Sequence, residues 1–119
     1  MPRRNHLVVV AEILEAVDGI QKATEGKSLE EFSQDWLVRH GVQRGLEIIS
    51  EASRHLPDDL LAAAPEIPWS RIRGIGNILR HEYHKIADAI VWAVVVDNLP
   101  PLRSAMERIR QAAEDTQGR

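Results

Sequence analysis

The stretch RIRGIGNILRHEYHKI, residues 71–86, combines the apolar repeat of a helix with a dense group of polar side chains. At about 100° of rotation per residue, one side of such a helix holds the apolar residues Ile72, Ile75, Leu79 and Ile86. The other side holds the polar residues Arg73, Asn77, Arg80, His81 and His84. We therefore expect one helix over residues 69–86, packed through its isoleucines, with the polar residues turned to solvent.

The same kind of repeat precedes this stretch. Apolar residues recur at spacings of three and four over residues 5–24, which predicts an amphipathic helix that Gly26 ends. Ser28 and Glu31 match a capping box, which predicts a second helix that reaches about residue 56 and could bend at Gly41 or Gly45. Its expected buried stripe comprises Phe32, Trp36, Leu46, Ile49, Ala52 and Leu56.

Prolines divide the rest of the chain. Pro57, Pro65 and Pro68 mark a connector with at most one short turn. A helix over residues 88–98 follows the basic stretch, and the double proline at 100–101 is expected to stop it. A further helix over residues 101–114 precedes a frayed tail. Since no segment alternates like a strand, we predict an all-α fold, an antiparallel bundle of four or five helices.

The composition suits one soluble domain. The 119 residues are enough for a single domain over 1–119 with a core over about 5–114. The net charge is −3, but residues 71–85 alone carry +3, so the rest carries −6. A local basic patch on an acidic protein indicates a phosphate-bearing partner. No cysteine is present, which excludes disulfides and thiolate metal sites. No apolar run reaches the roughly 20 residues that span a membrane, so we expect a cytoplasmic protein.

The polar side of the basic stretch suits RNA cleavage without a metal ion. Histidine titrates near neutral pH and can accept or donate the proton of a 2′-hydroxyl. Arginine holds phosphate oxygens with its planar fork of donors, and asparagine can orient either group. The alternative is a helix face that only keeps the protein soluble. Gly74 and Gly76 favour a ligand or a closely approaching backbone, because each costs a helix about 1 kcal/mol relative to alanine.

Other candidate sites are weaker. His40 and His55 stand alone on the second predicted helix and are expected at the surface. Glu47 and Glu51 share a helix face, but a solvated face or an ion pair with Arg44 is a simpler explanation than a catalytic carboxylate pair.

Metal binding and base stacking are weaker explanations too. His81 and His84 are three residues apart, but no carboxylate at a suitable spacing completes a ligand set, so we expect no metal and no cofactor. Trp36, Trp69 and Trp92 are expected to be core or interface anchors.

Four stretches resemble the HepT-like branch of the HEPN superfamily. They are WSRIRGIGNILRHEYHKI (69–86), IVWAVVVDNLPPL (90–102), RGLEIISEA (44–52) and KSLEEFSQD (27–35), and the resemblance covers residues 5–103. It implies a HEPN-like helical bundle that forms a homodimer, in which the motif helices of two protomers line a cleft. It also implies the toxin of a toxin–antitoxin pair, which cuts RNA without a metal. The antitoxin of that family is a minimal nucleotidyltransferase that silences the toxin by transferring AMP to the motif tyrosine.

The family motif is an arginine, four residues, a histidine, any residue and a tyrosine, with an asparagine directly after the arginine. By this resemblance the histidine is His81, the tyrosine and AMP acceptor is Tyr83, and the asparagine is Asn77. The arginine position falls on Gly76, which departs from the motif at a central catalytic residue.

Neighbouring arginines leave two hypotheses open. Arg80 or Arg73 could supply the missing guanidinium, displaced by one helical turn, about 5 Å. The resemblance then implies a ribonuclease whose catalytic residues are His81, Arg80, Asn77 and Arg73 and whose further RNA contacts are Arg71, His84 and Lys85. The alternative is a catalytically weak or inactive partner of a nucleotidyltransferase, because Gly76 replaces the motif arginine.

Overall fold

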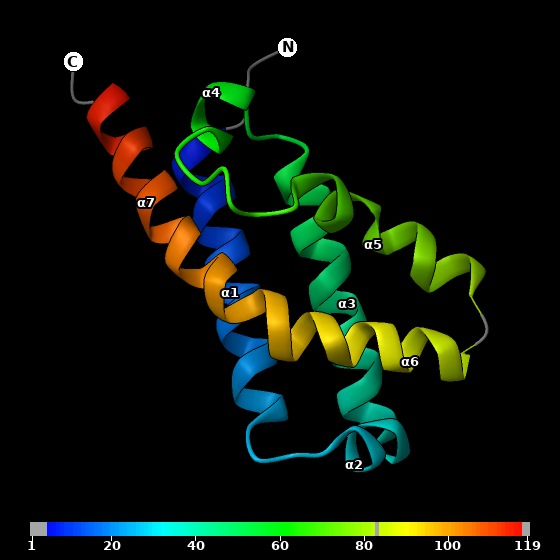
Figure 1. Cartoon of the computed structure of the whole chain (residues 1–119). Coiled ribbons are helices and arrows are strands. Elements are labelled where there is room, and N and C mark those ends of the chain that lie inside the picture. The colour runs from blue at the N-terminus through cyan, green and yellow to red at the C-terminus, as the bar shows by residue number, and fades with distance from the viewer. Residues whose placement is uncertain (1–4, 83, 118–119) are drawn as a thin grey trace.

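Long helices packed side by side form the centre of the molecule (Figure 1). The computed structural model describes residues 5–82 and 84–117. In chain order the elements are α1 (His6–Thr24), α2 (Leu29–Gln34), α3 (Trp36–Ser53), α4 (Asp58–Leu61), α5 (Trp69–His81), α6 (His84–Ala93), the π-helical segment η1 (Val94–Asn98) and α7 (Leu99–Gln117). Helix α1 runs antiparallel to α3 and α7, which both pack against it, and α5 and α6 form a corner beyond α3 (Figure 1). The predicted all-α fold is confirmed, since the described residues contain no strand.

The first predicted helix and the turn after it are confirmed. Gly26 has a φ of 73°, a left-handed conformation that glycine adopts without strain. The Ser28 hydroxyl accepts the Glu31 N–H at 3.1 Å, and the Glu31 carboxylate accepts the Ser28 N–H at 3.0 Å. The pKa of the Glu31 carboxyl is lowered, chiefly by that bond from the Ser28 N–H. This capping box starts α2 where the sequence predicts a helix.

The second predicted helix is divided at Asp35. Asp35 leaves the helical region at φ −94° and ψ 95°, and its Oδ1 accepts the Val38 N–H at 3.1 Å. It therefore caps the start of α3. Helix α3 then runs without a break through Gly41 and Gly45, where the sequence left a bend open.

The break at Asp35 also corrects the predicted buried stripe. Trp36 was expected inside, but its side chain is 65% exposed and stacks on the His40 ring at a centroid distance of 4.2 Å. A break resets the helical phase, so residues before and after it no longer share one face. The other members of the stripe are buried, namely Phe32, Leu46, Ile49, Ala52 and Leu56.

The predicted helix over residues 69–86 ends early. Helix α5 stops at His81, Glu82 is extended with φ −91° and ψ 148°, and α6 begins at His84. No glycine or proline marks this break in the sequence. The chain turns back here because α5 packs on α3 while α6 packs on α2. Ala87 and Val91 of α6 are buried.

The predicted stop at the double proline is wrong. Residues 84–117 are helical throughout, and the chain widens into the π turn of η1 just before Pro100 and Pro101. Proline lacks the N–H that an inner helical turn needs, and a π turn locally changes the hydrogen-bond register. The helix direction changes here between α6 and α7 (Figure 1). Leu99 and Leu102 are fully buried at this bend. Helix α7 extends to Gln117, three residues beyond the predicted end at residue 114.

Helices α1 and α3 approach closely at a glycine of α3. A Cβ atom at Gly45 would lie 2.7 Å from Cδ1 and 2.9 Å from Cγ1 of Ile20. One turn earlier, a Cβ at Gly41 would meet nothing within 4 Å. Gly45 therefore lets the isoleucine of α1 pack directly on the backbone of α3. Within residues 5–82 and 84–117, no helix is both long and apolar enough to cross a membrane.

We expect Gly41→Ala to stabilise the fold and Gly45→Ala not to do so. Alanine at either position favours the helix by about 1 kcal/mol. At Gly45 the added methyl overpacks the contact with Ile20, which costs about 1–3 kcal/mol. Urea unfolding should therefore show a stabilised Gly41→Ala and a neutral or destabilised Gly45→Ala. Equal stabilisation of both variants would contradict the close contact.

Candidate functional site

Three polar side chains of the motif lie together on the last two turns of α5. Asn77 and His81 are four residues apart, and Arg80 directly precedes His81, so all three project from the same end of the helix. All three residues are exposed. The buried Ile72 and Ile75 hold the earlier part of the helix against the core. The polar group thus sits at the corner between α5 and α6, at the edge of the molecule (Figure 1).

Other predicted site residues lie on different elements or turns. His84 and Lys85 are exposed and begin α6, after the extended Glu82. His84 therefore does not share one helix face with Arg73, Asn77, Arg80 and His81, and the predicted five-residue face is wrong at this position. Arg71 is exposed in the first turn of α5, about 15 Å along the helix from His81. Tyr83, the expected AMP acceptor, lies outside the described residues.

Arg73 does not point to solvent as the helical pattern predicts. Its Nη2 donates to the carbonyls of Ser53 at 3.2 Å and Leu56 at 3.4 Å, at the end of α3. In return, the Arg73 carbonyl accepts hydrogen bonds from the Ser50 hydroxyl and the Arg54 guanidinium, both at 2.8 Å. Arg73 therefore fastens α5 to the end of α3. The pattern misses this because periodicity gives the side of a helix but not the neighbour that faces it.

Arg80 lies close to the position where the motif arginine is absent. A Cβ atom built on Gly76 would be 3.2 Å from Nη1 of Arg80. Gly76 is buried although it has no side chain. The guanidinium of Arg80 thus covers the backbone of Gly76, one turn before its own.

A buried ion pair that no motif indicates supports the start of α6. Asp88 is 2% exposed, and its Oδ1 lies 3.8 Å from Nε of Arg39, whose Nη1 donates to the Ser33 carbonyl at 3.1 Å. The pair joins α6 to α3 and to the end of α2. It borders a pocket of about 470 Å³ that His84 and Lys85 also line. The one sequence signal for this pair is a charged residue inside an otherwise apolar run.

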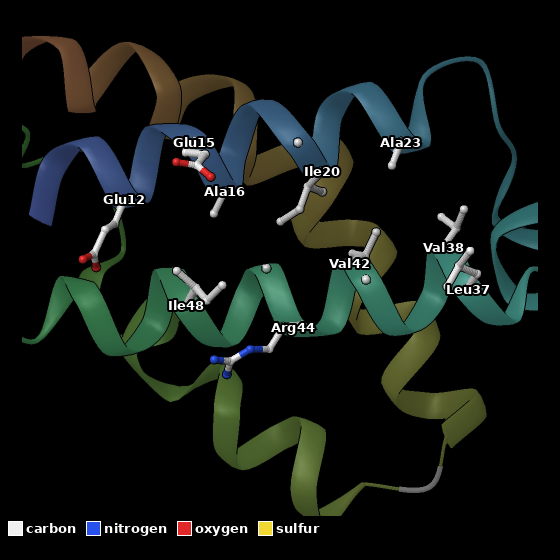
Figure 2. Close-up of a pocket in the computed structure, with 13 residues that line it drawn as sticks. Glu12, Glu15, Ala16, Ile20, Ala23, Leu37, Val38, Val42, Arg44 and Ile48 are labelled. Carbon is white, nitrogen blue, oxygen red and sulfur yellow. The ribbon is translucent and has the colours of Figure 1, made fainter.

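A larger groove of about 640 Å³ runs between α1 and α3. Figure 2 shows Ala16 and Ile20 of α1 facing α3, with Val42 and Ile48 on the opposite wall. Its charged lining consists of Glu12, Glu15, and Arg44. No residue of α5 or α6 lines it, so it is separate from the motif. Its apolar walls suit contact with another apolar surface more than acid–base chemistry.

The weaker candidates lie where the sequence places them. Glu47 is 3.5 Å from the guanidinium of Arg44, and Glu51 pairs with Arg54 at 3.8 Å and His55 at 3.4 Å. These ion pairs on α3 confirm the simpler explanation of the glutamates.

The other two tryptophans are packed as expected. Trp69 donates its Nε1–H to the Ala64 carbonyl at 3.1 Å, and Trp92 lies 5.2 Å from the Phe32 ring. Both are partly buried against the core.

Comparison with known proteins points to one family. The family model described as ribonuclease HepT-like matches residues 13–109. A protein of Thermococcus cleftensis named probable ribonuclease HepT is 32% identical over 109 residues, which are 92% of this chain and 99% of that protein. A candidate RNase of Methanocaldococcus jannaschii is 32% identical over 90% of this chain and 98% of its own. Another, of Caldanaerobacter subterraneus, is 30% identical over 83% of this chain and 88% of its own. No solved structure gives a significant match.

The contacts of Arg73 predict a difference between two arginines of α5. Arg73→Met keeps the aliphatic stem but removes the hydrogen bonds to α3, so we expect the free energy of unfolding to fall by about 1–3 kcal/mol. Arg71→Met, at an exposed position of the same helix, should change it by less than about 0.5 kcal/mol. Urea unfolding of both variants measures the difference. If Arg73→Met has the same free energy of unfolding as the wild type, Arg73 does not hold α5 against α3.

Proposed function

The chain belongs to the ribonuclease HepT-like family, and from that membership we propose that it is a ribonuclease that cleaves RNA at the end of α5. The observation that carries the proposal is the exposed group of Asn77, Arg80 and His81 on two turns of one helix. The group combines a proton acceptor, a phosphate-binding cation and an amide at the corner of an otherwise acidic protein. At the start of α6, Lys85 adds a positive charge for the RNA backbone and His84 adds a ring nitrogen that can hydrogen-bond to it.

The cleavage step needs no metal in this proposal. His81 takes the proton of a 2′-hydroxyl, whose oxygen attacks the adjacent phosphorus and forms a cyclic phosphate. The bond from phosphorus to the 5′-oxygen breaks, and that oxygen receives a proton from a second acid. In a homodimer whose motif helices face each other, the second copy supplies that acid. Arg80 stabilises the charge that develops on the phosphate oxygens, and Asn77 orients the reacting groups.

Regulation is proposed to act at the same corner. As the family resemblance implies, a nucleotidyltransferase antitoxin transfers AMP to Tyr83. Glu82 and His84, the described residues on either side of Tyr83 in the sequence, are both exposed. The added phosphate brings negative charge beside the basic residues and competes with RNA for them.

A second function remains for comparison, a catalytically weak protein that binds the nucleotidyltransferase. The observation that favours it is Gly76, which stands where the family motif has an arginine. The ribonuclease proposal is preferred because a guanidinium, that of Arg80, lies 3.2 Å from the position that a Cβ atom of residue 76 would take.

Cleavage of a labelled RNA in the presence of a chelator tests the two functions. We expect the wild type to cleave it and His81→Ala to be slower by about 100-fold or more, because proton transfer is lost. His40→Ala, on the exposed part of α3, is the matched control and should cleave as the wild type does. An inactive wild type, or equal rates for wild type and His81→Ala, would favour the binding-partner function.

The proposed regulation predicts weaker RNA binding after modification. We expect protein carrying AMP on Tyr83 to bind an oligoribonucleotide at least about tenfold more weakly, as measured by fluorescence anisotropy. Tyr83→Phe treated with the same transferase should keep its affinity. If modified and unmodified proteins bind equally, the phosphate does not compete with RNA.

A further inference from the structure

The two glycines of α5 have different surroundings. A Cβ atom at Gly74 would meet nothing within 4 Å beyond its own stretch of helix, whereas one at Gly76 would lie 3.2 Å from Nη1 of Arg80. The Gly76 backbone is buried, and Arg80 is exposed. The Arg80 side chain is therefore folded back over Gly76, and its guanidinium occupies the space that a side chain at residue 76 would enter.

Helix geometry explains this fold-back. The Cα–Cβ bonds of a helix tilt toward its N-terminus, so a long side chain covers the turn before its own Cα. Gly76 and Arg80 are four residues apart, a rise of about 6 Å, and an arginine stem spans that distance. We propose that Gly76 is a positioning residue that makes room for the Arg80 guanidinium, and that Arg80 binds the phosphate at the bond that is cleaved.

The other arginines of α5 are less suited to this task. Arg73 already donates to two carbonyls at the end of α3, and releasing it would loosen α5. Arg71 lies in the first turn, far from His81. Within the described part of the chain, neither a hydrogen bond nor an ion pair engages the Arg80 guanidinium, so its donors are available to a phosphate.

In this proposal the glycine at residue 76 is itself functional, because it leaves room for the guanidinium of Arg80. The guanidinium comes from residue 80 instead of residue 76, and it reaches back by one turn over Gly76. An apolar side chain at residue 76 would push the guanidinium away without replacing its contact with the phosphate. The motif is relocated along the helix, and the glycine and the arginine act as a pair.

The inference rests on the proposed ribonuclease function, and a matched pair of glycine variants tests it. We expect Gly76→Leu to lower kcat by about 100-fold, because a displacement of about 1 Å costs that much, and to raise KM by up to about tenfold, because the phosphate contact of Arg80 is weakened. The milder Gly76→Ala should lower kcat by less. Gly74→Leu, two residues away on the same helix, should leave cleavage unchanged. Thermal melting should show all three folded, since leucine and alanine favour helix over glycine. Recovery of cleavage in Gly76→Arg/Arg80→Leu relative to Arg80→Leu would support the exchange of positions.

RNA binding separates this inference from the ribonuclease function. In the His81→Ala background, adding Gly76→Leu or Arg80→Leu should weaken binding of an oligoribonucleotide by about tenfold, and adding Gly74→Leu should not. If the wild type fails to cleave but shows this binding pattern, the ribonuclease function fails and the pairing of Gly76 with Arg80 stands. If the wild type cleaves and Gly76→Leu matches Gly74→Leu, or if Arg80→Leu cleaves and binds as the wild type does, the inference is overturned.

Discussion

Helix α3 has no side chain at Gly45, and Ile20 of α1 fills the space that a methyl group there would need. This contact commits one side of α3 to α1. The next turns of α3 carry Ser50 and Arg54, which donate to the Arg73 carbonyl and hold α5 on another side of the same helix. The position of the motif helix therefore depends on α3, and that of α3 depends on its close packing with α1.

The two helices that carry the candidate site, α5 and α6, are each held against α3, and the site residues at the corner between them are exposed. Arg73 fastens α5 to the end of α3, and the buried Asp88 of α6 pairs with Arg39 near the start of α3. Between these two fastenings the chain turns at the extended Glu82. Burying charged groups is costly unless they are paired, so such contacts favour one arrangement of the corner. The residues that would meet RNA, His81 and Arg80, remain exposed.

The chain belongs to the HepT-like family although Gly76 stands where the family motif has an arginine. The helical arrangement of α5 reconciles the two. A motif written along the sequence assigns each role to a fixed position. On a helix, a long side chain also covers the turn before it, so residues four positions apart can serve the same place. We propose that Arg80 and Gly76 are such a pair, in which Arg80 supplies the guanidinium that the motif places at residue 76.

The sequence by itself determined the all-α fold, the extent of α1, the end of that helix before Gly26, the capping box at Ser28 and the residue types of the site. These features depend on spacing and on interactions within a few residues, which the sequence states directly. The tertiary structure alone decided that the helices break at Asp35 and Glu82 and that Pro100 and Pro101 lie within a continuous bent helix. It also decided that Arg73 faces α3 while Arg80 covers Gly76. Helical periodicity fixes which side of a helix a residue occupies, but the neighbour on that side, and the place where a chain must turn to reach it, follow from packing between segments far apart in sequence.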